Sequence, residues 1–125
     1  MGLVHAEFRL TNVFTQQSVD IRALVDTGAT DVFVTAEVAR ALGVDPEELS
    51  RANVTVADGR RVSIPCLPPL EIRFGSRRYY GTAYVMGSEC LVGVIPLEAM
   101  DLVVDLKKQT LGVNPAYPDA PFLRV

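Results

Sequence analysis

The sequence predicts an all-β fold, a mostly β barrel or sandwich with one or two short helices. Apolar and polar residues alternate with a period of two through many short segments, and glycine, proline and Asp-Gly turns separate these segments. The 125 residues are 49% hydrophobic and 22% charged, which suits a packed core. We expect one domain over residues 1–125, because two lobes of typical size need a longer chain.

The first part of the chain is expected to contain three strands. Alternation over residues 4–10 and 19–25 predicts two half-buried strands. The second of these ends directly before Asp26, and the apolar residues 32–34 predict a short third strand. An acid therefore lies between two apolar segments.

Two short helices are expected next. Thr35 has the chemistry of a cap for a helix over residues 36–42, which Gly43 ends. The segment Asp45-Pro46-Glu47-Glu48 combines a cap residue, a proline at the first helical position and following acids, which is typical of a second helix start. This helix can have only a turn or two, because alternation resumes at residue 54.

Two hairpins are expected in the middle of the chain. Residues 54–56 and 62–64 alternate on either side of Asp58-Gly59, a pair typical of hairpin turns. A second hairpin is expected to turn near Gly75-Ser76, with Arg77 and Arg78 solvated in the turn. In this hairpin we expect one strand to face the other as follows: Leu70, Ile72 and Phe74 opposite Tyr80, Thr82 and Tyr84.

The last part of the chain is expected to finish the sheet. Residues 91–93 predict a short strand, and residues 96–100 a helical turn. Two further strands, 102–104 and 111–113, are joined by a polar turn. The tail over residues 115–125 contains three prolines and is expected to be extended.

A weak internal repeat links the two halves. LVDTGAT at residues 24–30 and LVGVIPL at residues 91–97 share their first two residues, and each precedes a short helix. The match suggests two halves of similar topology, of which only the first carries an acid.

Asp26 is the residue that says most about chemistry. A lone buried carboxylate is costly, so such a group is usually paired, hydrogen-bonded or protonated. Thr27 offers a hydroxyl, Gly28 allows a tight turn and Ala29 keeps the approach narrow, so this loop can hold the acid rigidly. Two neighbouring carboxyls supply an acid and a base, because their repulsion leaves one protonated. Since Asp-Thr-Gly occurs once, the second acid would come from another copy in a two-fold dimer.

Two segments resemble a known family. ALVDTGATDVFV (residues 23–34) is similar to the active-site segment of the retropepsin-like (retroviral-type, clan AA) aspartic proteases, and LVGVIPLEAMDLVVDLKKQTL (residues 91–111) resembles their second signature. The hairpin around Asp58-Gly59 falls where the family has its flap. The resemblance covers roughly residues 4–113 and is closest to the small stand-alone members.

This resemblance implies a closed β-barrel with a flap hairpin, and a homodimeric aspartic endopeptidase acting on peptide or protein substrates. It implies that Asp26 is the catalytic acid/base, and that Thr27 locks the two active-site loops together across the dimer axis. Gly93 would pack beneath the loop. The remaining residues implied by the family are Gly28, Thr30 and Asp31, which would line the cleft beside Ala29, and the flap tip Ala57, Asp58, Gly59 and Arg60.

The sequence departs from the viral members at three places. Val94 stands where they carry an arginine that braces the dimer, and Gly59 is the flap tip's single glycine. The proline-containing tail does not read as a strand that could interleave at a dimer interface. An alternative is therefore a catalytically inactive peptide-binding or dimerisation module on the same fold. Asp-Thr-Gly alone is also typical of an ordinary turn.

Composition argues against other classes of function. A net charge of −3 and a pI near 5.1 do not suit a nucleic-acid partner. One histidine, His5, and two separated cysteines, Cys66 and Cys90, support neither a metal site nor a cofactor, and favour reduced thiols in a cytoplasmic protein. The start MGLVHAEFRL has no secretory pattern, and no apolar run approaches the ~18 residues of a membrane span.

Overall fold

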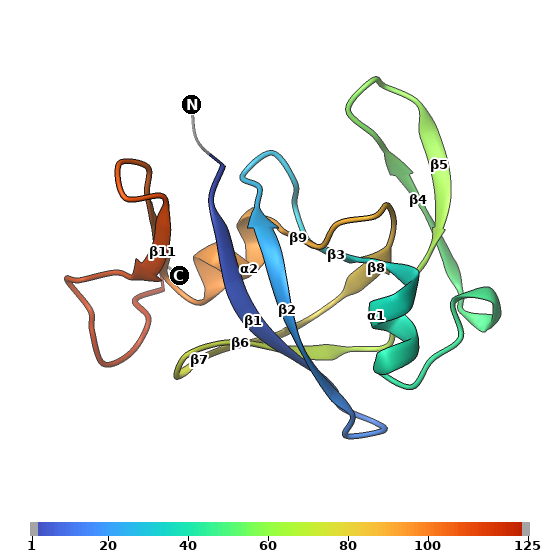
Figure 1. Ribbon diagram of the computed structural model, residues 1–125, viewed down its shortest axis with the longest axis horizontal. Helices are drawn as coiled ribbons and strands as arrows, with labels where there is room; N and C mark the ends of the chain where they lie inside the picture. Colours follow the sequence, from blue (N-terminus) through green and yellow to red (C-terminus); the bar gives the residue numbers. More distant parts are fainter. Residues whose placement is uncertain (1–2, 124–125) are drawn as a thin grey trace.

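The computed structural model describes residues 3–123, which form a curled β-sheet and two projecting hairpins (Figure 1). Seven strands make the main sheet, in the order β7-β6-β1-β2-β9-β3-β8. The strands are β1 (His5–Asn12), β2 (Ser18–Val25), β3 (Val32–Val34), β4 (Arg51–Thr55), β5 (Arg61–Pro65), β6 (Leu70–Phe74), β7 (Arg77–Gly81), β8 (Ala83–Val85), β9 (Leu91–Val92), β10 (Leu102–Asp105) and β11 (Thr110–Val113). The helices are α1 (Ala36–Ala41), the single 3-10 turn η1 (Pro46–Glu48) and α2 (Val94–Ala99).

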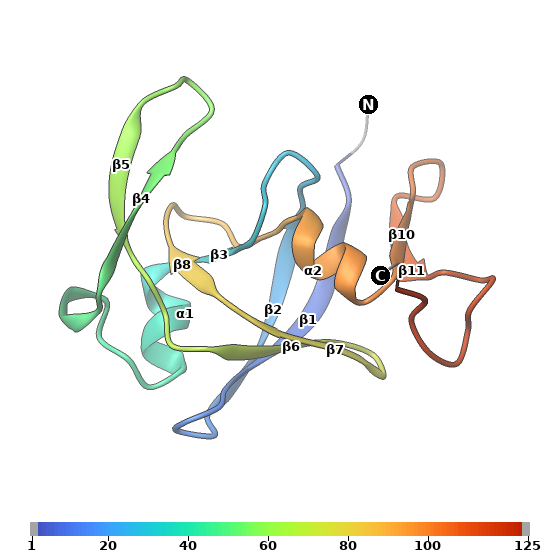
Figure 2. The same ribbon diagram turned by 180° about the vertical axis from the view of Figure 1, so that it is seen from behind.

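The sheet bends into a nearly closed barrel around one apolar core. Figures 1 and 2 show the curled sheet from both sides, with α2 between it and the β10–β11 hairpin. Alternate residues of β1 and β2 face inward, so that Phe8 lies opposite Ile21 and Ala6 opposite Ala23. The core includes residues with no exposed surface from most strands of the sheet: Leu10, Ala23, Val32, Val34, Leu70, Ile72, Ala83 and Val92. The predicted all-β fold with short helices is confirmed.

The caps of the short helices are also as predicted. The Thr35 hydroxyl accepts a hydrogen bond from the Val38 amide at 3.2 Å, which satisfies one of the unpaired amides at the start of α1. The Asp45 carboxylate does the same for Glu47 at 3.0 Å. Each cap fixes where the chain turns between the sheet and the β4–β5 hairpin.

The four strands β2, β9, β3 and β8, at one end of the sheet, follow a two-fold pattern in their order and direction. β2 and β9 run parallel, β9 and β3 antiparallel, and β3 and β8 parallel. This order relates β3 to β9, each followed by a helix, and β2 to β8. The sequence repeat instead matched β2 with β9, which are paired neighbours with Leu24 opposite Leu91. The predicted likeness of the two halves is therefore present in the topology, but the repeat aligned the wrong strands.

The predicted pairing of the second hairpin is wrong. The turn near Gly75-Ser76 is present, but it is so tight that Arg77 lies directly opposite Phe74 and Tyr79 opposite Ile72. The strand also ends at Gly81, and β8 leaves to pair with β3. Tyr84 therefore lies in β8, at the end of the sheet beside β3, rather than in this hairpin.

Arg77 is buried, which corrects the prediction of a solvated turn. Its side chain is 3% exposed, because pairing with Phe74 turns it inward. Its Nη1 donates to the carbonyl oxygen of Met100 at the end of α2 at 2.8 Å, and its Nη2 donates to that of Tyr117 in the tail. No acid within residues 3–123 forms an ion pair with it. Two backbone carbonyls thus solvate a buried cation.

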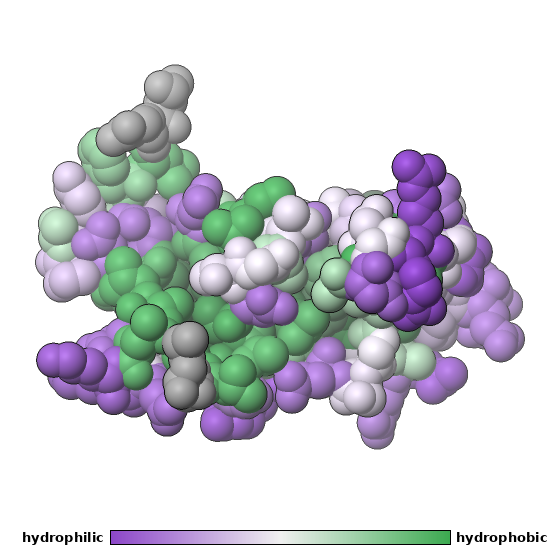
Figure 3. All heavy atoms as spheres, turned by 90° about the horizontal axis from the view of Figure 1, so that it is seen from above, coloured by the Kyte–Doolittle hydropathy of each residue, from purple (hydrophilic) through white to green (hydrophobic). Residues whose placement is uncertain are grey.

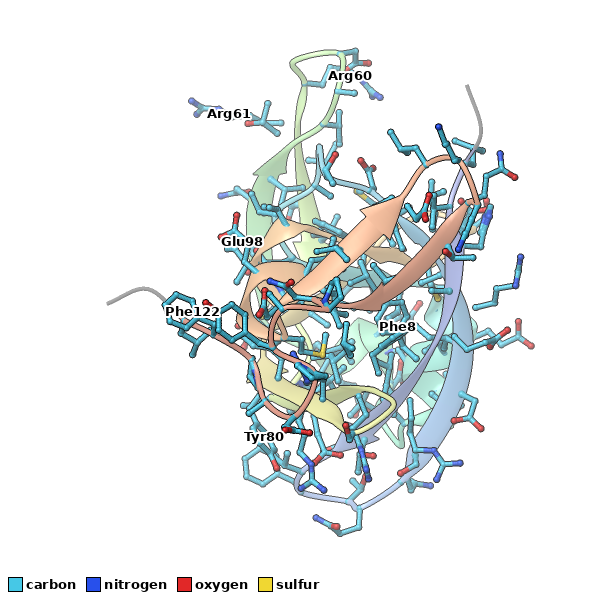
Figure 4. All side chains as sticks on the ribbon, turned by 90° about the vertical axis from the view of Figure 1, so that its left-hand side faces the viewer. Phe8, Arg60, Arg61, Tyr80, Glu98 and Phe122 are labelled. Carbon is cyan, nitrogen blue, oxygen red and sulfur yellow. The ribbon has the colours of Figure 1, made fainter. Side chains whose placement is uncertain are left out.

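The tail folds back instead of being extended. The Phe122 amide and the Asn114 side chain donate to the Asp101 carboxylate at 3.1 Å and 3.2 Å. The rings of Tyr117 and Phe122 stack with centroids 4.7 Å apart, and Figure 4 shows Phe122 on the outer side of this loop. For residues 124 and 125, the prediction of an extended tail lies outside the described residues. Within residues 3–123, no helix is long and apolar enough to cross a membrane.

Replacing Arg77 with lysine is expected to lower the free energy of unfolding by about 1–3 kcal/mol, because an ammonium cannot reach both carbonyls with the same fork. The released tail should exchange its amide hydrogens faster over residues 114–123, as measured by hydrogen–deuterium exchange. Arg78→Lys is the matched control, since Arg78 is exposed and meets Glu71 only at 3.6 Å. Equal stability and equal exchange rates in the two variants would contradict the role of buried Arg77 in joining the end of α2 to the tail.

Candidate active site

The loop between β2 and β3 holds Asp26 by its backbone and its side chain. The Asp26 amide donates to the Val92 carbonyl at 3.0 Å, and the Asp26 carbonyl accepts from Ala29 at 3.1 Å. Within the turn, the Gly28 amide donates to Asp26 Oδ1 at 2.9 Å. This hydrogen bond holds the Asp26 side chain in place within the turn. The loop thus fixes one acid in a defined orientation.

The start of α2 supports this loop from beneath. The amides of Gly93, Val94 and Ile95 donate to the carbonyls of Asp31, Ala29 and Thr30, at 2.8, 2.9 and 2.9 Å. These amides have no partner inside the helix, so the loop satisfies them. A Cβ atom at Gly93 would lie 2.5 Å from the Ala29 carbonyl oxygen and 2.7 Å from that of Asp31. Only glycine allows the two segments to approach this closely.

A cleft of about 490 Å³ opens beside Asp26. The loop forms one wall, the β4–β5 hairpin forms another, and β3, β8 and β9 form the floor. Its lining residues are Asp26, Gly28, Ala29, Thr30, Asp31, Phe33, Val54, Thr55, Val56, Ala57, Tyr84, Met86 and Leu91. Such a mostly apolar cleft with few polar groups is typical of a binding site.

The structure brings six of the residues singled out in the sequence to this cleft. They are Asp26, Gly28, Ala29, Thr30, Asp31 and Ala57. Gly93 lies under the loop, as described above, and Thr27 lies on the outer side of it, exposed, beside a smaller groove. Asp58, Gly59 and Arg60 are not among the lining residues.

The tip of the β4–β5 hairpin is bonded to itself. The Asp58 carboxylate accepts from the Arg60 amide at 3.0 Å and from Arg60 Nε at 2.6 Å. These hydrogen bonds lower the pKa of Asp58. Figure 4 shows Arg60 and Arg61 at the far end of the hairpin, projecting into solvent. The hairpin therefore reaches the cleft through the end of β4, Val56 and Ala57, not through the other three tip residues.

Sequence reasoning missed the side chains that shape the floor. Phe33 and Tyr84 line the cleft with their rings 5.7 Å apart. Burial raises the pKa of Tyr84, and the negative charge of Asp31 raises it further. Met86 and Leu91 complete the floor. The alternation of Val54 and Val56 marked a strand, but only the fold reveals which strands meet at Asp26.

The histidine and the two cysteines do not line the cleft. Within residues 3–123 there is no group of three metal-ligating side chains. Cys66 and Cys90 are free, and burial raises the pKa of Cys90. His5 is partly covered, and its Nε2 lies 3.6 Å from Glu89 Oε2.

Comparison with known proteins places these features in context. The family model described as aspartyl protease matches residues 12–96. No curated protein shows significant sequence similarity to the chain.

Solved structures similar to the chain include the following three. The EIAV protease complexed with the inhibitor HBY-793 has 15% identity and a TM-score of 0.64, covering 84% of this chain and 94% of its own. A retropepsin-like aspartic protease from Rickettsia conorii has 21% identity and a TM-score of 0.58, covering 83% and 88%. The retroviral protease-like domain of Ddi1 from Leishmania major has 21% identity and a TM-score of 0.57, covering 98% and 97%. These matches confirm the predicted retropepsin-like fold.

Gly93→Ala is expected to displace the Asp26 loop, because the added methyl group meets backbone that cannot move aside. Unfolding free energy should fall by about 1–3 kcal/mol, measured by denaturant titration. Gly112→Ala is the matched control, since a Cβ there meets nothing within 4 Å, and it should stay within about 0.5 kcal/mol of the parent. A Gly93→Ala protein as stable as the control would contradict the close approach.

Proposed function

Since the chain belongs to the aspartyl protease family, we propose that it is a homodimeric aspartic endopeptidase. The observation that carries the proposal is the position of Asp26, on a loop fixed by backbone hydrogen bonds and beside a cleft. One carboxylate cannot act as acid and base at the same moment, so the reaction needs the Asp26 of a second subunit. The predicted cytoplasmic location is part of this proposal, and the free cysteines suit it.

The mechanism uses a water held between the two Asp26 carboxyls. The ionised Asp26 accepts a proton from the water as its oxygen attacks the peptide carbonyl carbon. The protonated Asp26 gives its proton to the carbonyl oxygen, which leaves a neutral tetrahedral intermediate. Proton transfer to the nitrogen then breaks the carbon–nitrogen bond and releases an amine and a carboxylic acid. No covalent link to the enzyme forms.

An apolar surface supports the proposed dimer. Leu3 and Leu106 are 67% and 65% exposed and border a groove of about 250 Å³. Thr27 and Val104 line the same groove, directly beside the Asp26 loop. Figure 3 shows apolar residues gathered at the centre of the face seen from above, with polar residues at the end that carries the β4–β5 hairpin. A two-fold axis near Asp26 would bury this surface between copies.

Thr27 fits the proposed lock between the two loops. It is exposed, and within residues 3–123 its hydroxyl has no hydrogen-bond partner. A partner subunit's loop can satisfy it. In the dimer, the two clefts join into one channel for an extended peptide, which the β4–β5 hairpins would cover.

The cleavage of a diverse peptide pool at pH 3–7, read by mass spectrometry, tests the activity. We expect cleavage that is strongest at acid pH and that falls by at least about a thousandfold in Asp26→Asn. Asp119→Asn, which removes the same charge from the exposed tail, should cleave normally. Absence of cleavage by a dimeric protein at every pH would favour the inactive peptide-binding or dimerisation module.

Leu106→Asp is expected to weaken the dimer at least about tenfold, because it places a charge in an apolar interface. The dimer dissociation constant can be measured by sedimentation velocity over a dilution series. Phe14→Asp is the matched control: Phe14 is 73% exposed, but lies on the β1–β2 turn at the opposite end of the barrel (Figure 1). A dimer that Leu106→Asp weakens no more than Phe14→Asp does would contradict an interface at this surface.

A further inference from the structure

Asp31 lines the cleft without a cation to neutralise it. Its backbone is fixed, because its carbonyl accepts from the Gly93 amide at 2.8 Å. Its carboxylate accepts one hydrogen bond, from the Thr30 hydroxyl at 3.1 Å. Within residues 3–123, no lysine, arginine or histidine lies within 4.0 Å of that carboxylate. The side chain thus presents a negative charge in a half-buried position.

The cleft as a whole is acidic. Two carboxyls, Asp26 and Asp31, line it, and none of the other lining residues is basic. The arginines of the nearby hairpin do not line the cleft. Arg60 is held by Asp58 at 2.6 Å, and Arg51 donates to the Ser63 hydroxyl at 3.0 Å. Arg61 lines a neighbouring pocket that shares Val54 and Thr55 with the cleft. The negative charge is therefore available to a bound molecule.

The cleft floor offers aromatic surface to the same molecule. Phe33 and Tyr84 form a tilted ring pair, and the charge of Asp31 acts on the phenols of both Tyr84 and Tyr79. Aromatic faces and a carboxylate together favour a cationic side chain with a long apolar stem, because the stem covers the rings and the head meets the acid.

We propose that Asp31 is a specificity-determining residue that selects peptides carrying a lysine or arginine within a few residues of the cleaved bond. The proposal rests on the peptide-binding cleft of the proposed function and adds the class of substrate. In a two-fold dimer an Asp31 lies on each side of the paired Asp26 residues, so a basic residue is favoured on either side of the bond.

Peptide binding by the Asp26→Asn protein tests the selection without requiring catalysis. The probes are a series of extended fluorescent peptides in which one lysine, norleucine or glutamate is moved through each position. Dissociation constants are measured by fluorescence anisotropy at pH 6 and low salt. At one or more positions we expect lysine to bind about five- to tenfold more tightly than norleucine, with glutamate weakest.

Adding Asp31→Asn should reduce the lysine preference to within about twofold, while adding the control Asp119→Asn should leave it unchanged. Equal binding of lysine and norleucine peptides, a preference that survives Asp31→Asn, or no binding of any peptide would overturn the proposal. Cleavage of the same series by the unmodified protein is scored separately. Lysine-selective binding without cleavage would reject the protease activity and leave the selection by Asp31 intact.

Discussion

The close approach of Gly93 to the Asp26 loop is the constraint on which the site depends. Three carbonyls of the loop bond to the first amides of α2, and the absent side chain at position 93 makes this possible. The helix in turn ends at Met100, whose carbonyl is held by buried Arg77. Hydrogen bonds therefore connect the loop, the helix and the tail into one unit, and Asp26 lies on the loop at one end of it.

This unit explains how a carboxylate fits between two apolar strands. Asp26 follows β2 and is only partly buried, and its carboxylate accepts a hydrogen bond from the Gly28 amide. It lines a cleft whose surface is mostly apolar. In the proposed dimer the two Asp26 carboxyls repel each other, and a shared proton relieves that repulsion. The sequence predicts where the acid lies along the chain. The fold places an apolar groove beside the Asp26 loop, and a second copy would cover this groove in the proposed dimer.

Local physics made much of the fold predictable. Alternation located β1 and β2, and cap chemistry located the start of α1 at Thr35. Pairings that depend on one residue of register were less predictable: the tight turn at Gly75-Ser76 moved Arg77 inward and separated Tyr84 from its expected strand. The cleft floor could not be predicted, because Phe33, Tyr84 and Leu91 come from strands that only the sheet order brings together.

The central claim is that each active site contains two copies of Asp26. Mixing the unmodified protein with Asp26→Asn at fixed total concentration, after the subunits have exchanged, tests it directly. If both acids are required, activity follows the square of the unmodified fraction, so a 1:1 mixture retains about one quarter. A linear fall, with about one half retained at 1:1, would show that a single subunit forms the site and would contradict the account.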